Sequence, residues 1–205
     1  MPITVVSGVT GVGMSSICQT ARKDLSDEYT LINFGDSMLE QAAVHDITTN
    51  RDELSSVSHR KIRRLQRRAG EFVADRAEGD HILLATHLAV DTDKGFIDGL
   101  PDDVLSEISP DRFVVVEAEP ALIVDRRDRS DRDIEPASPR TIEFEQHLNR
   151  SAALEYARDQ NAPIEFVENS GEISEAATEL LEILDDGHSG GHDRHPKRRT
   201  LRHIQ

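Results

Sequence analysis

Tryptophan is absent from this chain of 205 residues, and cysteine occurs only once, as Cys18. A single cysteine excludes an internal disulfide and provides too few thiolates for a zinc centre. Cys18 falls on the apolar side of a predicted helix, so we interpret it as a buried structural thiol rather than a catalytic one. Long hydrophobic runs are also missing. No stretch of about eighteen apolar residues occurs, so we expect no transmembrane helix.

Basic residues are in short supply: 24 Lys and Arg stand against 39 Asp and Glu, and the net charge at pH 7 is -15. Such a surface repels phosphate backbones and anionic lipids, so we expect neither membrane binding nor a specific nucleic-acid partner. The acidity suits a protein that stays soluble in concentrated salt, where ions screen self-repulsion, and we interpret it as salt adaptation. No charged leader precedes the first predicted strand, so we expect no secretory signal and a cytoplasmic location.

Short apolar runs rich in β-branched residues alternate with longer segments of helical periodicity. The predicted strands are Ile3–Val6, Thr30–Asn33, His81–Ala85, Phe113–Val116 and Ile164–Val167. The predicted helices are Ser15–Asp24, Asp36–Val44, Arg60–Ala77, Pro120–Arg127, Thr141–Asp159 and Ile173–Leu184. Almost wholly apolar strands separated by helices indicate an α/β fold with a parallel sheet covered on both faces. Ligands bind at the carboxyl ends of the strands of such sheets.

Two segments lack this periodicity. Residues 128–140 are nearly all charged, Pro or Ser, which predicts a mobile loop between two helices. Residues 188–205 hold five Lys or Arg and one Asp among Gly and His, so we predict a disordered tail. The folded domain is therefore predicted to span residues 1–187.

A glycine-rich segment follows the first predicted strand and opens the first predicted helix. It consists of Gly8, Val9, Thr10, Gly11, Val12, Gly13, Met14, Ser15 and Ser16. Glycines let the backbone wrap closely around an anion, and the amides and dipole of a helix N-terminus favour negative charge. The spacing fits a phosphate loop that binds a nucleotide, with Ser15 as the Mg²⁺ ligand, although Met14 stands at the usual lysine position. The alternative is a glycine-rich turn without a ligand.

Further motifs follow in a fixed order along the chain. They are Gly8–Gly13, Asn33–Met38, Asn50–Asp52, Ala69–Gly70, Thr86–His87, Lys94–Gly95, Gly99–Pro101, Arg132–Glu135, Glu145–His147, Asn149–Arg150 and Ala152–Ala153. These motifs cover roughly residues 1–185, and in this set the chain resembles the archaeal adenylate kinases. Members of that family transfer the terminal phosphoryl group of ATP to AMP with Mg²⁺, yielding two ADP. The resemblance therefore implies an adenylate kinase with ATP and Mg²⁺ as cofactors and AMP and ADP as nucleotide partners.

The resemblance also implies a fold of the P-loop kinase type, with a doubly wound parallel sheet of about five strands. A helical insert on the AMP side would span residues 35–68, and a short lid would span residues 128–140. Some members are trimers, so the resemblance extends to a homo-oligomer. One departure is Ala85, which stands where the family usually has an Asp that helps to hold the water shell of Mg²⁺.

Arginines are the side chains best suited to neutralise a transferring phosphoryl group, because a planar guanidinium matches phosphate oxygens in pairs. We predict catalytic roles for Arg126, Arg127, Arg132 and Arg150, which lie around the predicted lid. Their charge matters more in this chain because the phosphate loop has Met14 in place of its lysine. For the basic residues of segment 59–68, a solvated helix face is an equal alternative.

The AMP side has its own candidates. The predicted substrate-binding residues are Phe34, Gly35, Met38, Arg51, Thr86 and His87. Core packing is an equal alternative for Met38, and a structural imidazole is an equal alternative for His87. Three other functions compete with adenylate kinase: a nucleotide-binding or regulatory module that has lost catalysis, a kinase for another nucleoside monophosphate, and a kinase for another small molecule.

Overall fold

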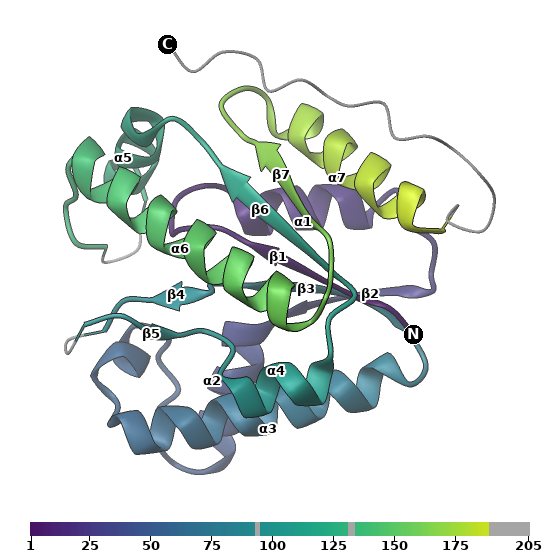
Figure 1. Ribbon diagram of the computed structural model, residues 1–205. Helices are drawn as coiled ribbons and strands as arrows, with labels where there is room; N and C mark the ends of the chain where they lie inside the picture. The colour runs from purple at the N-terminus through teal and green to yellow at the C-terminus, as the bar shows by residue number, and fades with distance from the viewer. Residues whose placement is uncertain (93–94, 131–133, 189–205) are drawn as a thin grey trace.

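A five-stranded parallel sheet forms the centre of the computed structural model, which describes residues 1–92, 95–130 and 134–188 (Figure 1). The strands are β1 (Ile3–Ser7), β2 (Tyr29–Asn33), β3 (His81–Thr86), β6 (Arg112–Glu117) and β7 (Ile164–Glu168). They lie in the order β2-β3-β1-β6-β7, and every pairing in this sheet is parallel. The predicted α/β fold with a doubly wound five-stranded sheet is therefore confirmed.

Helices cover both faces of the sheet (Figure 1). They are α1 (Met14–Arg22), α2 (Phe34–Val44), α3 (His59–Ala77), α4 (Asp102–Ile108), α5 (Pro120–Asp128), α6 (Pro139–Asp159) and α7 (Ile173–His188). Helices α1 and α7 pack together on one face, whereas α3, α4 and α6 contribute to the core of the other face. Among the described residues, no helix combines the length and apolar character needed to span a bilayer.

Both faces of the sheet are apolar, which explains the continuous hydrophobic runs of its strands. On β1, Val6 packs into the core beneath α1 and α7, and its neighbour Val5 packs into the opposite core. Val114 and Val115 on β6 divide in the same way. Successive side chains of a strand point to opposite faces, so a strand covered on both sides is apolar at most of its positions.

Every predicted strand and helix is present, with small shifts at the ends. The sequence did not predict α4, the 3₁₀ turn Asp52–Ser56, or the antiparallel hairpin of β4 (Ala89–Val90) and β5 (Ile97–Asp98). These elements are too short to show a hydrophobic period. Helix α7 includes His188, the first residue of the predicted tail, and the rest of that tail lies outside the described residues.

Candidate active site

The phosphate loop connects β1 to α1 at the carboxyl edge of the sheet (Figure 1). Gly11 and Gly13 have φ angles of 85° and 92°, a left-handed conformation that side-chain-bearing residues rarely adopt. Gly13 is the residue that caps the N-terminus of α1. Ser15 and Ser16 are exposed in the first turn of this helix, where free amides and the helix dipole favour an anion. The loop therefore has the backbone geometry expected of a phosphate site.

Met14 does not face the phosphate site. Its side chain is 5% exposed and belongs to the core cluster that also holds Ile17 and Val12. The position that carries lysine in most phosphate loops is thus committed to the core. The positive charge needed beside a triphosphate must come from other elements.

Arg126, on α5, lies against the helix side of the loop. Its Nη1 donates to the carbonyl oxygen of Val12 at 3.2 Å, and its Nη2 donates to that of Asn169 at 2.9 Å. Asn169 follows β7 and donates its side-chain Nδ2 to the same Val12 oxygen at 2.7 Å. A methyl group on Gly13 would come within 2.4 Å of that Nδ2 and 4.0 Å of Arg126 Nη1. The half-buried Arg126 therefore lies beside the start of α1, where its guanidinium donates to neutral carbonyl oxygens.

Arg127 supports the loop from below. The residue is 9% exposed, its Nε donates to the Thr10 carbonyl oxygen at 2.9 Å, and its side chain packs under Gly11. Both terminal nitrogens bind the carboxylate of Glu145 on α6, at 3.2 and 2.5 Å. The prediction that Arg127 binds phosphate stays a prediction. In this structure its hydrogen bonds go to the loop backbone and to Glu145.

Helix α6 holds several parts of the site together. Asn149 is 2% exposed, and its Oδ1 accepts from Ser7 Oγ at 2.7 Å and from the Leu88 amide at 3.2 Å. Ser7 ends β1 directly before the phosphate loop. Arg150 binds Glu117 at the end of β6 through Nε and Nη2, at 2.8 and 2.7 Å. The fourth predicted arginine, Arg132, lies outside the described residues.

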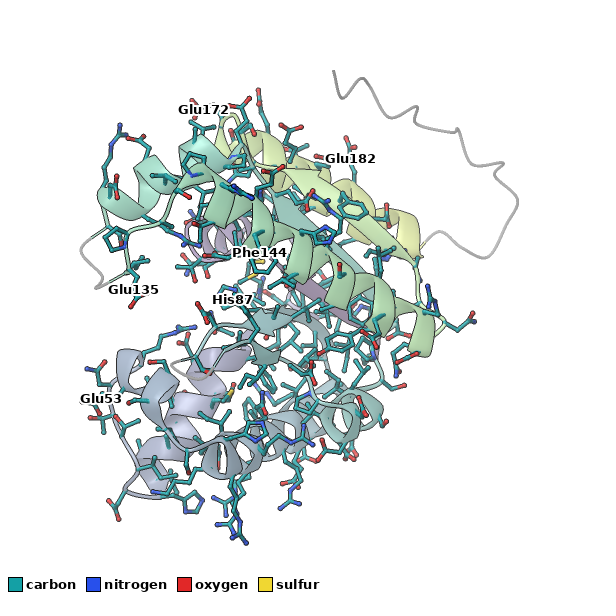
Figure 2. The ribbon with its side chains drawn as sticks, turned by 60° about the vertical axis from the view of Figure 1, so that its left-hand side comes forward. Glu53, His87, Glu135, Phe144, Glu172 and Glu182 are labelled. Atoms are coloured by element: carbon teal, nitrogen blue, oxygen red, sulfur yellow. The ribbon has the colours of Figure 1, made fainter. Side chains whose placement is uncertain are left out.

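The end of β3 contacts the other side of the loop. Thr86 is buried as the last residue of β3, and the Nδ1 of His87 lies 2.5 Å from the carbonyl oxygen of Gly8. Figure 2 shows His87 between the half of the molecule that carries Glu53 and the loop that carries Glu135. Both predicted residues thus lie beside the phosphate loop, where an acceptor could approach the donor nucleotide.

The remaining predicted AMP-side residues surround the start of α2. Arg51 donates to Asp36 at 2.5 Å and to Asn33 Oδ1 at 3.2 Å, and a methyl group on Gly35 would lie 2.5 Å from Arg51 Nη2. Gly35 therefore allows the guanidinium to approach the backbone. Phe34 is only 1% exposed and packs in the core, while Met38 is half-buried at the edge of that core.

The described residues offer few side chains that could bind a metal or react as a thiol. Among the described residues, no three His, Cys, Asp or Glu side chains come together as a metal site. The exposed Ser15 hydroxyl can supply one ligand, and Mg²⁺ takes most of its ligands from water and substrate phosphates. The residues present therefore fit a nucleotide-bound Mg²⁺. Burial raises the pKa of Cys18 to about 12, so this thiol stays protonated and inert.

Sequence reasoning missed the partners that hold these arginines and loops. Glu145, Asn149 and Glu117 received no role, although Glu145 and Asn149 belong to motifs of the family resemblance. The sequence signal for the residues on α6 was that polar side chains, such as Asn149, occur on a helix face that is otherwise apolar. Such a pattern predicts buried polar contacts without identifying the partners.

Comparisons with known proteins agree with this geometry. The sequence profile of the "AAA domain" family matches residues 7–143. The adenylate kinase of Pyrococcus abyssi is 37% identical over 188 residues, which is 89% of this chain and 95% of that protein. Those of Methanococcus aeolicus and Methanothermobacter thermautotrophicus are 38% and 34% identical, each over 189 residues. These matches cover 89% and 90% of this chain and 97% and 100% of the two proteins.

Solved structures of other kinases share the fold. A shikimate kinase from Bacteroides thetaiotaomicron matches with a TM-score of 0.56 over 90% of this chain and 98% of its own. A gluconokinase from Sinorhizobium meliloti matches with a TM-score of 0.50 over 93% of this chain and 98% of its own. Both are 14% identical, so these likenesses establish the architecture alone. The sequence relatives are more specific, and together with the loop geometry they identify the chain as a member of the adenylate kinase family.

Proposed function

We propose that this chain is an adenylate kinase that reversibly transfers the terminal phosphoryl group of ATP to AMP, yielding two ADP. The observation that carries the proposal is the similarity to archaeal adenylate kinases over about nine-tenths of the chain. The left-handed glycines and free helix amides of the phosphate loop support it, because they suit a triphosphate. In the proposed reaction, the phosphate loop therefore holds ATP as the donor, and AMP binds beside β3 as the acceptor.

Phosphoryl transfer requires alignment and charge neutralisation rather than a protein nucleophile, because the AMP phosphate is itself anionic. The loop amides of residues 8–16 bind the donor phosphates, and Arg126 supplies positive charge that buried Met14 cannot. Arg150 and Arg132 are proposed to assist at the transferring group. Ser15 would hold Mg²⁺ together with the donor phosphates, and the ion would supply charge neutralisation at that position.

The acceptor is proposed to bind between the start of α2 and the end of β3. Arg51 can exchange its contact with Asp36 for the AMP phosphate, because the pair is partly exposed to water. His87 and Thr86 stand on the opposite side of this approach, next to the phosphate loop. The domain spans residues 1–187, with an AMP-side insert at 35–68 and a lid at 128–140. Part of that lid, residues 131–133, lies outside the described residues.

We also propose the salt adaptation, the enzyme type, the location and the oligomeric state of this enzyme. Its acidic composition supports adaptation to high salt, and the archaeal relatives support an archaeal type of enzyme. A cytoplasmic location suits its nucleotide substrates, and a homo-oligomer, such as a trimer, follows from the family resemblance. Light scattering at several salt concentrations measures the oligomeric state.

A coupled assay tests the function directly. Purified protein is given ATP, Mg²⁺ and each nucleoside monophosphate in turn, from low to molar KCl. We expect ADP formation with AMP and increasing activity as salt rises. Turnover with CMP or UMP and none with AMP would reassign the acceptor. Calorimetric ATP binding without ADP formation at any salt would instead identify a non-catalytic nucleotide-binding module.

A further inference from the structure

The first half of α3 carries a concentration of positive charge. Residues 59–68 hold six Lys or Arg and no Asp or Glu, in a chain whose net charge is -15. The composition as a whole predicts no specific nucleic-acid partner, but that prediction averages over an uneven distribution of charge. At physiological salt an exposed charge acts over about 8 Å, so acidic residues on distant parts of the surface do not cancel this local field.

Most of these basic side chains form a stripe on one side of the helix. The α3 stripe consists of Arg60, Lys61, Arg64, Arg67 and Arg68. A helix has about 3.6 residues per turn, so the stripe lies on the side opposite the buried Ile62 and Ala69. Arg68 is half-buried, and the other four side chains of the stripe are exposed. Helices α2 and α4 pack against other sides of α3, which lies along the lower margin of the molecule in Figure 1.

Acidic neighbours compensate little of this charge. Among the described residues, the ion pairs of the basic segment join Arg63 to Asp103 at 3.0 Å and Arg67 to Glu71 at 3.9 Å. The other four members of the stripe have no ion-pair partner in the part of the chain that the structure describes. Salt bridges within the protein therefore do not neutralise this face.

The charge also lies where it lowers the stability of the helix. The dipole of a helix is positive at its N-terminus and disfavours cations there. The first turn of α3 has no acidic residue and begins with His59, Arg60 and Lys61. Arg60, Arg64 and Arg68 follow at intervals of four residues, so like charges meet on successive turns. Local rules broken without compensation are expected at functional sites, so the stripe indicates a negatively charged partner.

An exposed aromatic ring continues the stripe. Phe72 lies one turn beyond Arg68, is 40% exposed, and is the only large apolar side chain of α3 that is exposed. Single-stranded nucleic acids bind to surfaces that combine a cationic track with an aromatic ring on which a base stacks. An acidic protein surface offers no base to this ring, and an amphipathic helix that enters a membrane needs a wider apolar face.

We propose that this side of α3 binds single-stranded nucleic acid, with the α3 stripe along the phosphates and Phe72 stacked on a base. Guanidinium groups bind phosphate oxygens in pairs, which suits the four arginines of the stripe. These contacts reach the backbone and the face of a base but not its edge, so many sequences are tolerated. None of these side chains takes part in the proposed phosphoryl transfer, and the inference does not depend on that function.

The test measures binding of a short fluorescein-labelled oligouridylate to the full chain by fluorescence anisotropy at increasing KCl. Circular dichroism identifies the KCl concentrations at which the protein is folded. Each phosphate contact on a single strand contributes about 0.7 to the fall of log K with log[KCl], so five cations predict a slope of about -3.5. Absence of binding at the lowest KCl concentration that keeps the protein folded would overturn the proposal.

Two kinds of variant separate the contribution of the charges from that of the ring. Arg64→Gln and Arg68→Gln should each weaken binding severalfold and make the slope shallower by about 0.7. Phe72→Leu should weaken binding about tenfold and leave the slope unchanged, because a stacked base releases no counterion. The matched controls are Arg158→Gln on α6 and Phe166→Leu on β7, which replace exposed residues outside α3 and should alter neither value.

Polyglutamate and phosphatidylserine vesicles test the other anionic partners. Polyglutamate carries negative charge without bases, and the vesicles present anionic lipid headgroups. Binding of either one as tightly as the oligouridylate, or an unchanged affinity of Phe72→Leu for the oligouridylate, would overturn the proposal. ADP formation by the stripe variants should equal that of the natural protein. An active kinase that does not bind the oligouridylate refutes this inference alone, whereas absence of turnover refutes the proposed function alone.

Discussion

The donor side and the acceptor side of this active site are built in different ways. On the donor side, the side chains of Arg127 and Glu145 are 7% and 18% exposed, and they support the phosphate loop from beneath. On the acceptor side, Arg51 and Asp36 form a single ion pair whose side chains are 35% and 58% exposed. Burial strengthens an ion pair and makes it costly to break, whereas water competes for an exposed one.

This difference matches what each side must do. The donor loop gains by having its amides fixed before the nucleotide arrives, because preorganised dipoles stabilise developing charge without rearranging. In the proposed reaction, Arg51 exchanges one anion, the Asp36 carboxylate, for the AMP phosphate, and a weak pair that water can reach lets it do so. The comparison indicates a rigid donor site beside an adaptable acceptor site.

The largest effect is expected from the buried pair. Arg127→Met leaves Glu145 without its partner, so the free energy of unfolding should fall by about 3–5 kcal/mol. The loop would lose its support at Thr10, and kcat should fall about a hundredfold because the donor is misaligned. Denaturant unfolding and steady-state kinetics measure the two effects. Arg112→Met is the control: Arg112 pairs with Glu165 at the amino end of β6, so the free energy of unfolding should fall while kcat is unchanged.

Glu145→Gln decides whether Arg127 supports the loop or binds phosphate. A supporting role predicts a loss of kcat close to that of Arg127→Met. It also predicts that the double variant Arg127→Met, Glu145→Gln is no worse than either single change. A phosphate ligand predicts the opposite result for Glu145→Gln, because a freed guanidinium would bind ATP more tightly. Tighter ATP binding by Glu145→Gln would contradict the supporting role of Arg127, and with it the difference drawn between the donor side and the acceptor side.

A smaller loss is expected from Gly13→Ala in the donor loop. The φ of 92° disfavours alanine, and the added methyl group would meet Asn169 Nδ2 at 2.4 Å. We expect the affinity for ATP to fall by about 2 kcal/mol, since the loop must deform to relieve this contact. Isothermal titration with an unreactive ATP analogue measures it. Gly79→Ala, where nothing lies within 4 Å of the new methyl group, should leave the affinity unaltered.

The acceptor side is expected to respond weakly to the loss of its ion pair. Asp36→Asn should change the free energy of unfolding by less than about 1 kcal/mol, because the pair is exposed. The KM for AMP should fall severalfold as Arg51 is released, and kcat should change little. Kinetics with varied AMP at fixed ATP measure both values. A large loss of stability would show that this side is as rigid as the donor side.

Cys18 packs in the same core cluster as Val9 and Val12 of the donor loop. Titration of its thiol should not affect the stability of the protein at neutral pH. Burial raises its pKa from 9.0 to about 12, so the folded protein holds a proton that the unfolded chain releases above pH 9. The contribution of this thiol to stability is complete below pH 9 and declines by about 1.4 kcal/mol per pH unit between pH 9 and 12. Unfolding curves of the natural protein and Cys18→Ala across this range should differ by that slope.

The sequence anticipated the fold better than the site. Strands such as Phe113–Val116 were visible because burial on both faces favours apolar residues at successive positions. The phosphate loop was visible because Gly8, Gly11 and Gly13 lie close together in the chain, between a strand and a helix. The hairpin β4–β5 and helix α4 were missed because two to seven residues cannot show a period.

What the sequence determined by itself is therefore local: which segments are strands and helices, where the anion-binding turn lies, and which family motifs occur. What only the tertiary structure decided is where each guanidinium and amide finds its partner. Arg127 meets Thr10 from 117 residues away, and Asn169 meets Val12 from 157 residues away. The physical reason is that a hydrogen bond depends on distances of about 3 Å, and chain folding alone brings such distant groups that close.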